Sequence, residues 1–213
     1  MALVHVLDIA RDVAQVCKKC PNGTLEAAII RSARKFLRET RWYRSALTGS
    51  TAANTRAYSL GSDPYEEIIG IRAMSFTQTS GNSSQDRPIG VSDPTGWDPN
   101  LSTGSPRRYA YIPEGQFALD PIPDQVYPLT VTLVLIPKSG QNQLEERVLR
   151  KWDQAIQAGA LDYLLRLKEP WQDINEANAQ QKRFQSAINN AKADEQREYQ
   201  RGAQRARPRQ FIV

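Results

Sequence analysis

Histidine is almost absent from this chain of 213 residues, which contains one, His5. Ser-His-Asp and Cys-His catalytic systems would both depend on this residue, and no neighbouring side chain in the sequence would orient it as a base. The isolated glycines lie outside any strand–loop–helix frame that could bind phosphate. These absences argue against an enzyme, and we predict no catalytic residue and no cofactor.

Cysteine is also scarce: Cys17 and Cys20 are the two in the chain. A structural zinc site needs four ligands, and the sequence offers one histidine elsewhere. A redox Cys-x-x-Cys motif opens a helix after a strand, whereas here a helix is expected to end. We therefore predict two reduced, unreactive thiols and no metal site.

Long hydrophobic runs are missing. No segment approaches the ~20 consecutive apolar residues of a membrane span. The first residues, MALVHVLDIARDVAQV, carry Asp8, Arg11 and Asp12 within an apolar pattern. That pattern is typical of an amphipathic helix rather than of an export signal.

A strong charge imbalance is likewise absent, since 28 Lys and Arg face 23 Asp and Glu for a net charge of +5. The basic excess gathers at the C-terminal end, where three acids accompany the cations Lys182, Arg183, Lys192, Arg197, Arg201, Arg205, Arg207 and Arg209. Such an arm could contact DNA phosphates without sequence preference. A DNA-binding accessory protein is therefore one hypothesis, and a docking peptide for a partner protein is the other.

Two helices are predicted at the start of the chain, over residues 3–19 and 25–39, separated by the breaker Pro21-Asn22-Gly23. Thr24 is the expected N-cap of the second helix. Its apolar face is expected to hold Leu25, Ile29, Ala33, Phe36 and Leu37. Its other face carries Arg31, Arg34, Lys35 and Arg38.

The middle of the chain favours strands. Strand signals cover residues 57–60, 67–76, 107–112, 116–119 and 127–136, and residues 77–106 read as a long structureless loop. In the last strand we predict a core of Leu129, Val131, Leu133 and Leu135. Asp120 and Asp124 stand beside prolines and are interpreted as turn formers. This pattern predicts a small antiparallel sheet or a sandwich.

Helical periodicity returns from about residue 144, and a long polar helix is expected over residues 173–201. We predict helical or inter-subunit packing for Trp152, Ile156, Leu164, Trp171 and Phe184. The end of the chain, RARPRQFIV, cannot continue the helix past Pro208.

These elements predict an α+β fold with a bundle-like helical domain and an inserted antiparallel β domain. The expected boundaries are residues 1–56 plus 138–202 for the helices, 57–137 for the strands with the loop 77–106, and 203–213 for an extended arm.

Three stretches carry a family resemblance: LEAAIIRSARKFLRETRWYR, FALDPIPDQVYPLTVTLVLIP and LRKWDQAIQAGALDYLLRLKEPWQDINEANAQQKRFQSAINNAK. Together they resemble the head-to-tail adaptor (connector) proteins of tailed bacteriophages. The nearest group is that of short-tailed phages whose adaptor is called tail tubular protein A. The most specific parts are Pro-x-Pro-Asp before a long strand and a Trp-x-x-Ala-Ile-x-x-Gly-Ala-Leu helix before Pro-Trp.

The resemblance implies a structural protein of the virion neck, assembled in the host cytoplasm. It implies a homo-oligomeric ring, commonly of twelve subunits, that binds the portal protein and extends the channel for double-stranded DNA. Tail, nozzle or fibre proteins would attach to this platform, and no membrane is involved. The C-terminal arm would then dock on the portal through Arg205, Arg207, Pro208, Arg209, Phe211, Ile212 and Val213.

Overall fold

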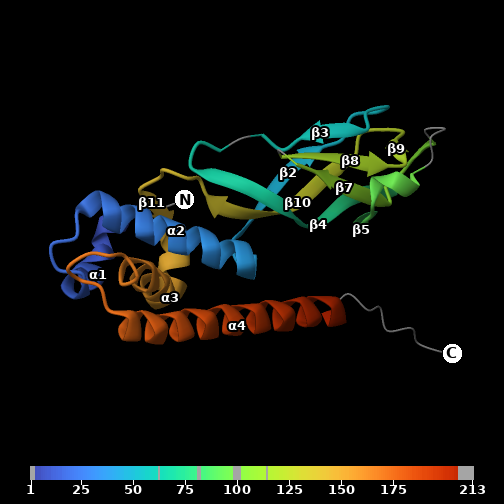
Figure 1. Ribbon diagram of the computed structural model, residues 1–213. Coiled ribbons are helices and arrows are strands. Elements are labelled where there is room, and N and C mark those ends of the chain that lie inside the picture. The colour runs from blue at the N-terminus through green and yellow to red at the C-terminus, as the bar shows by residue number, and fades with distance from the viewer. Residues whose placement is uncertain (1–2, 62, 81–82, 98–101, 114, 206–213) are drawn as a thin grey trace. The chain divides into compact units, whose positions relative to one another are not determined.

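The computed structural model describes residues 3–61, 63–80, 83–97, 102–113 and 115–205 (Figure 1). These residues form four α-helices and a seven-stranded sheet, so the predicted mixed α and β class is confirmed. The chain divides into two compact units, residues 1–42 with 137–213 and residues 43–136. Among the described helices, none is both long enough and apolar enough to cross a membrane.

The first unit, called the helical unit below, contains all four α-helices. Its elements are β1 (Leu3–His5), the 3-10 helix η1 (Val6–Asp8), α1 (Ala10–Val16), α2 (Asn22–Thr40), β11 (Gln143–Glu145), α3 (Glu146–Leu164) and α4 (Ile174–Arg205). β1 and β11 pair antiparallel and so connect the two chain segments that make up this unit.

The prediction of a helix over residues 3–19 is wrong for its first residues, since α1 begins at Ala10. Residues Leu3–His5 form a strand because Val4 pairs with Leu144, far away in the sequence. The His5 side chain then accepts a hydrogen bond from the Leu7 backbone nitrogen and caps η1. The expected helix at Leu144 fails for the same reason, and α3 begins two residues later.

Helix α2 has the predicted apolar face, since Leu25, Ile29, Ala33, Phe36 and Leu37 are all buried. Its N-cap is Pro21 rather than Thr24, and it begins at Asn22. The Pro21 carbonyl oxygen accepts from the Thr24 and Leu25 backbone nitrogens, which are the first hydrogen bonds of the helix, and no side chain caps this end. The helix ends at Thr40, because Arg41 adopts the left-handed conformation.

Helices α2, α3 and α4 pack closely around small residues. Ser32 Oγ on α2 donates a 2.7 Å hydrogen bond to the Ile156 carbonyl oxygen on α3. A Cβ at Gly159 would lie 2.2 Å from that Oγ, so glycine permits the close approach of the helices at this position. The Phe36 ring lies 5.1 Å from the Trp152 ring and 6.2 Å from the Phe184 ring.

Helix α4 begins after Asp173, whose side chain accepts from the Glu176 backbone nitrogen. Its apolar stripe of Ala177, Phe184, Ile188 and Ala191 is buried. The helix continues to Arg205, four residues beyond the predicted end. The extended arm expected from residue 203 therefore begins no earlier than residue 206, and Arg207, Pro208, Arg209, Phe211, Ile212 and Val213 lie outside the described residues.

The second unit, called the strand unit below, holds the seven-stranded sheet, ordered β2-β10-β4-β5-β7-β8-β3. The strands are β2 (Arg44–Ser50), β3 (Ala57–Ser59), β4 (Glu66–Ser80), β5 (Ser83–Val91), β7 (Arg108–Ile112), β8 (Gln116–Asp120) and β10 (Pro128–Pro137). A parallel two-stranded sheet pairs β6 (Thr103–Gly104) with β9 (Ile122–Pro123).

Two sheet predictions need correction. Residues 77–106 are not a structureless loop, since they complete β4 and supply β5, the 3-10 helix η2 (Pro94–Gly96) and β6. The sheet is larger than predicted and not wholly antiparallel, because β5 and β7 pair in parallel at Gly90 and Arg108. Backbone pairing defines β5: five of its residues, from Ser84 to Pro88, are exposed and give no apolar alternation.

The strand β10 carries the core side chains of this unit. Leu129, Val131, Leu133 and Leu135 are buried, with β2 paired along one edge. The residues near Asp120 form a corner, and Asp120 itself is buried. Its carboxylate accepts from the Arg108 guanidinium, 3.0 Å from Nε, so this aspartate has an ion-pair role besides the turn role expected for it.

Candidate functional site

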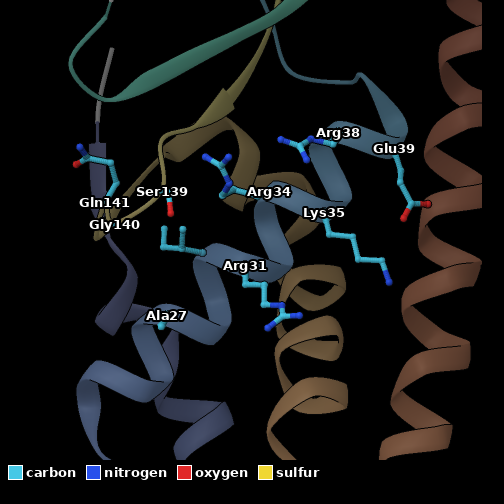
Figure 2. Close-up of a pocket in the computed structure, with 10 residues that line it drawn as sticks. Ala27, Arg31, Arg34, Lys35, Arg38, Glu39, Ser139, Gly140 and Gln141 are labelled. Carbon is cyan, nitrogen blue, oxygen red and sulfur yellow. The ribbon is translucent and has the colours of Figure 1, made fainter.

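The most distinctive surface of the helical unit is a groove on α2, with a volume of about 500 Å³. Its cations are Arg31, Arg34, Lys35 and Arg38, and its other lining residues are Ala27, Ile30, Glu39, Ser139, Gly140 and Gln141. We call it the α2 groove. Figure 2 shows the four basic side chains fanning out from the helix and Glu39 directed toward α4.

The four cations share one stripe of α2 because they stand three, four and seven positions apart. At 3.6 residues per turn, those spacings fall within about 100° of the helix circumference. The opposite stripe holds Leu25, Ile29 and Phe36, which are buried. Burial of that face against the other helices fixes the rotation of α2 and turns the cations outward.

Aromatic rings and a carbonyl position three of the cations. The Arg31 guanidinium lies 4.4 Å from the centre of the Tyr163 ring, and Lys35 Nζ lies 5.5 Å from that of Phe184. Arg34 donates to the Pro137 carbonyl oxygen. These contacts position the charged groups themselves, and neither a ring nor a carbonyl oxygen cancels the positive charge.

One acid borders the groove, and it is engaged elsewhere. Glu39 lies 3.9 Å from Lys192 on α4, a salt bridge between its carboxylate and Nζ. Arg31, Lys35 and Arg38 form no salt bridge with any described carboxylate of the chain, and all three are exposed. The α2 groove is therefore a concentrated positive surface, suited to binding an anion.

The thiols lack the chemistry of a nucleophile or metal ligand. Burial raises the pKa of Cys17 to about 11, with a smaller contribution from Cys20. Burial also raises the pKa of Cys20, helped by Glu169. Both thiols therefore stay protonated at neutral pH, and the thiolate is the reactive form.

His5 is used by the fold. Its Nδ1 accepts a hydrogen bond from the Leu7 backbone nitrogen at 3.2 Å. Its Nε2 lies 3.0 Å from Nδ2 of Asn142. Within the described part of the chain, no three His, Cys, Asp or Glu side chains gather to hold a metal ion.

The residues predicted for helical or inter-subunit packing all lie in the helical unit. Ile156, Leu164 and Phe184 are buried, and Trp152 and Trp171 are half-buried. The Trp152 indole lies edge-on to Trp42, with ring centres 6.0 Å apart. The Nε1 atoms of both Trp152 and Trp171 are buried and have no hydrogen-bond partner among the described residues.

The sequence showed the basic face of α2 but not its importance. A run of cations on a helix is ordinarily a solvated face, and nothing in the local pattern reveals a concavity. The groove needs the turn at Ser139, Gly140 and Gln141, more than one hundred residues away in the chain. Gly140 has a positive φ of 83°, a conformation that glycine adopts without strain.

Comparison with known proteins bears on the whole chain. No curated protein matches it. The family model described as SU10 adaptor protein matches residues 6–209, which span both the helical and the strand units. The chain therefore belongs to the SU10 adaptor protein family, and it is a phage adaptor protein.

Proposed function

We propose that this protein is a non-enzymatic head-to-tail adaptor, a structural component of the virion neck. The observation that carries the proposal is the family match over residues 6–209. The protonated thiols and the structural use of His5 support a role without catalysis. Within the family we place it in the tail tubular protein A-like group of short-tailed phages, on the Pro-x-Pro-Asp and Pro-Trp motifs.

In this proposal the subunits form a homo-oligomeric ring, most simply a dodecamer, that binds the portal protein and extends the DNA channel. The helical unit forms the ring wall and the inserted strands provide the platform for tail, nozzle or fibre proteins. A ring requires a heterologous contact that closes by rotation. Trp152 and Trp171 are compatible with such a contact, because both side chains are half-buried and leave part of their surface for a neighbouring subunit.

The C-terminal arm is the proposed portal-docking element. In RARPRQFIV, residues 205–213, every second residue is an arginine at the start, and the segment ends in the apolar Phe-Ile-Val. This composition suits an extended segment that is added to a partner's groove or sheet edge. The described structure places Arg205 as the last residue of α4, so docking would begin directly at a helix end.

Co-sedimentation with the purified portal protein tests this function. The adaptor is expected to migrate with the portal through a sucrose gradient and to leave it when the arm is deleted. An adaptor that stays at the top of the gradient, yet shifts duplex DNA in a gel, would instead favour the DNA-binding accessory role.

A further inference from the structure

Three cations of the α2 groove are not neutralised by salt bridges within the described part of the chain. Arg31, Lys35 and Arg38 are exposed, and none makes a salt bridge to a described carboxylate. Like charges three and four positions apart on a helix destabilise it. A cluster that is unfavourable for the helix itself points to an anionic ligand from outside this chain.

The cations are already held for binding. The Arg31 guanidinium lies over Tyr163 and the Lys35 ammonium over Phe184, so both charged groups are positioned before a ligand arrives. This positioning lowers the entropy cost of ordering long side chains at an interface. Arginine also offers a planar fork that matches a carboxylate through two parallel hydrogen bonds.

The spacing fits an extended acidic peptide. Arg31 and Arg38 are seven residues apart, which is about 10.5 Å along a helix axis. In an extended peptide of polyproline II type, which has three residues per turn and a rise of about 3.1 Å per residue, side chains three residues apart lie on the same side and are separated by about 9 Å. A segment with the pattern acid-x-x-acid could therefore meet both guanidinium groups at once.

The shape of the groove separates a peptide from DNA. Its lining includes the exposed side chain of Ala27 beside the buried Ile30, and Gly140 and its neighbours form a further wall. An aliphatic side chain of a peptide can cover Ala27, whereas a phosphodiester backbone carries no apolar group for it. A concavity of about 500 Å³ also suits a peptide strand better than the broad convex surface of a duplex.

We propose that the α2 groove docks an acidic, extended segment of a partner protein, with carboxylates on Arg31 and Arg38 and an aliphatic side chain over Ala27. The inference deepens the proposed adaptor function and rests on it for the partner being a virion protein. The groove itself is tested without portal or tail, so the two claims can fail separately.

The test is fluorescence anisotropy of the full chain with three labelled probes. These are the acidic peptide GELAELG, its neutral counterpart GQLAQLG and a 20-base-pair DNA duplex. We expect saturable binding of the acidic peptide, no binding of the neutral one, and a loss of about tenfold or more in affinity for the double variant Arg31→Gln/Arg38→Gln. The matched control is Arg11→Gln/Lys18→Gln, two exposed cations of the same unit outside the groove, which should change affinity less than twofold.

Should Arg31→Gln/Arg38→Gln melt below the assay temperature, Lys35→Gln/Arg38→Gln replaces it and leaves the Tyr163 contact intact. The proposal is overturned by equal binding of GQLAQLG, by no peptide binding at about 1 mM, or by unchanged affinity in the folded variants. Tighter binding of the duplex that is lost with the same substitutions would also overturn it, and would make the groove a phosphate-binding surface.

Discussion

Ser32 Oγ on α2 donates a hydrogen bond to the Ile156 carbonyl oxygen on α3, and it does so within contact distance of Gly159. A methyl group at position 159 would lie 2.2 Å from Ser32 Oγ and 2.8 Å from the Phe184 ring. This close approach brings three helices together and holds α2 with its cations outward.

Gly159→Ala is expected to destabilise the protein, although alanine is the better helix former. Overpacking costs about 1–3 kcal/mol and outweighs the gain of up to about 1 kcal/mol in helix propensity. The measurement is urea unfolding. Gly23→Ala is the matched control, because Gly23 also lies in a helix and a Cβ there meets nothing within 4 Å. Equal effects of the two substitutions would contradict the close packing.

Asp120→Ala is expected to lower the free energy of unfolding by about 1.5–3 kcal/mol, since a buried carboxylate loses hydrogen bonds to a cation. Its partners are Arg108, at 3.0 Å from Nε, and Arg56 at 3.9 Å. Asp86→Ala is the control, an exposed aspartate bonded to Thr77, with an expected effect within about 0.5 kcal/mol. If Asp120→Ala lowers the free energy of unfolding no more than Asp86→Ala does, the ion pair does not contribute to stability.

The raised pKa of Cys17 gives stability a pH dependence. In the unfolded chain the thiol ionises near its ordinary pKa of 9.0, and in the folded protein at about 11. Above pH 9 the unfolded state therefore loses the proton first, so the stabilising contribution is complete below pH 9 and decreases toward pH 11. Wild type should lose more stability than Cys17→Ala between pH 8 and pH 10, measured by denaturant unfolding. Parallel losses would contradict the burial effect.

Thiol labelling tests the difference in exposure between Cys17 and Cys20. Cys20 is half-buried and Cys17 is 1% exposed, so Ellman's reagent at pH 8 should modify Cys20 first. Cys17 should react only when the protein unfolds. Faster labelling of Cys17, judged in the single Cys→Ser variants, would be incompatible with its position in the core.

How much of the fold was predictable depends on whether an element is defined by its own side chains. The buried faces of α2 and β10 follow from apolar periodicity within each segment, and the sequence indicated both. β1 and β5 are defined by their partners instead. Val4 becomes a strand residue by pairing with Leu144, and Gln85 by pairing with Gln78, information that no local window contains.

The groove illustrates the same limit for function. Its cations were visible as one face of a helix, but the wall near Gly140 comes from a distant turn. Asp120 is a comparable case: the neighbouring prolines explain a corner, and its ion pair appears only once β7 lies beside β8.

Deletion of residues 206–213 is expected to weaken attachment to the portal and leave the subunit folded, because the helices and the sheet are complete without them. Portal binding is followed by co-sedimentation and folding by thermal melting. A fall in melting temperature as large as that of a core substitution such as Ile156→Ala would show that the arm belongs to the fold rather than to docking.

Negative-stain microscopy of the protein mixed with its portal tests the central claim most directly. The account predicts rings of the protein, with twelvefold symmetry, stacked on the portal and continuous with its channel. Monomeric particles beside bare portals, from a preparation that shifts duplex DNA, would contradict it.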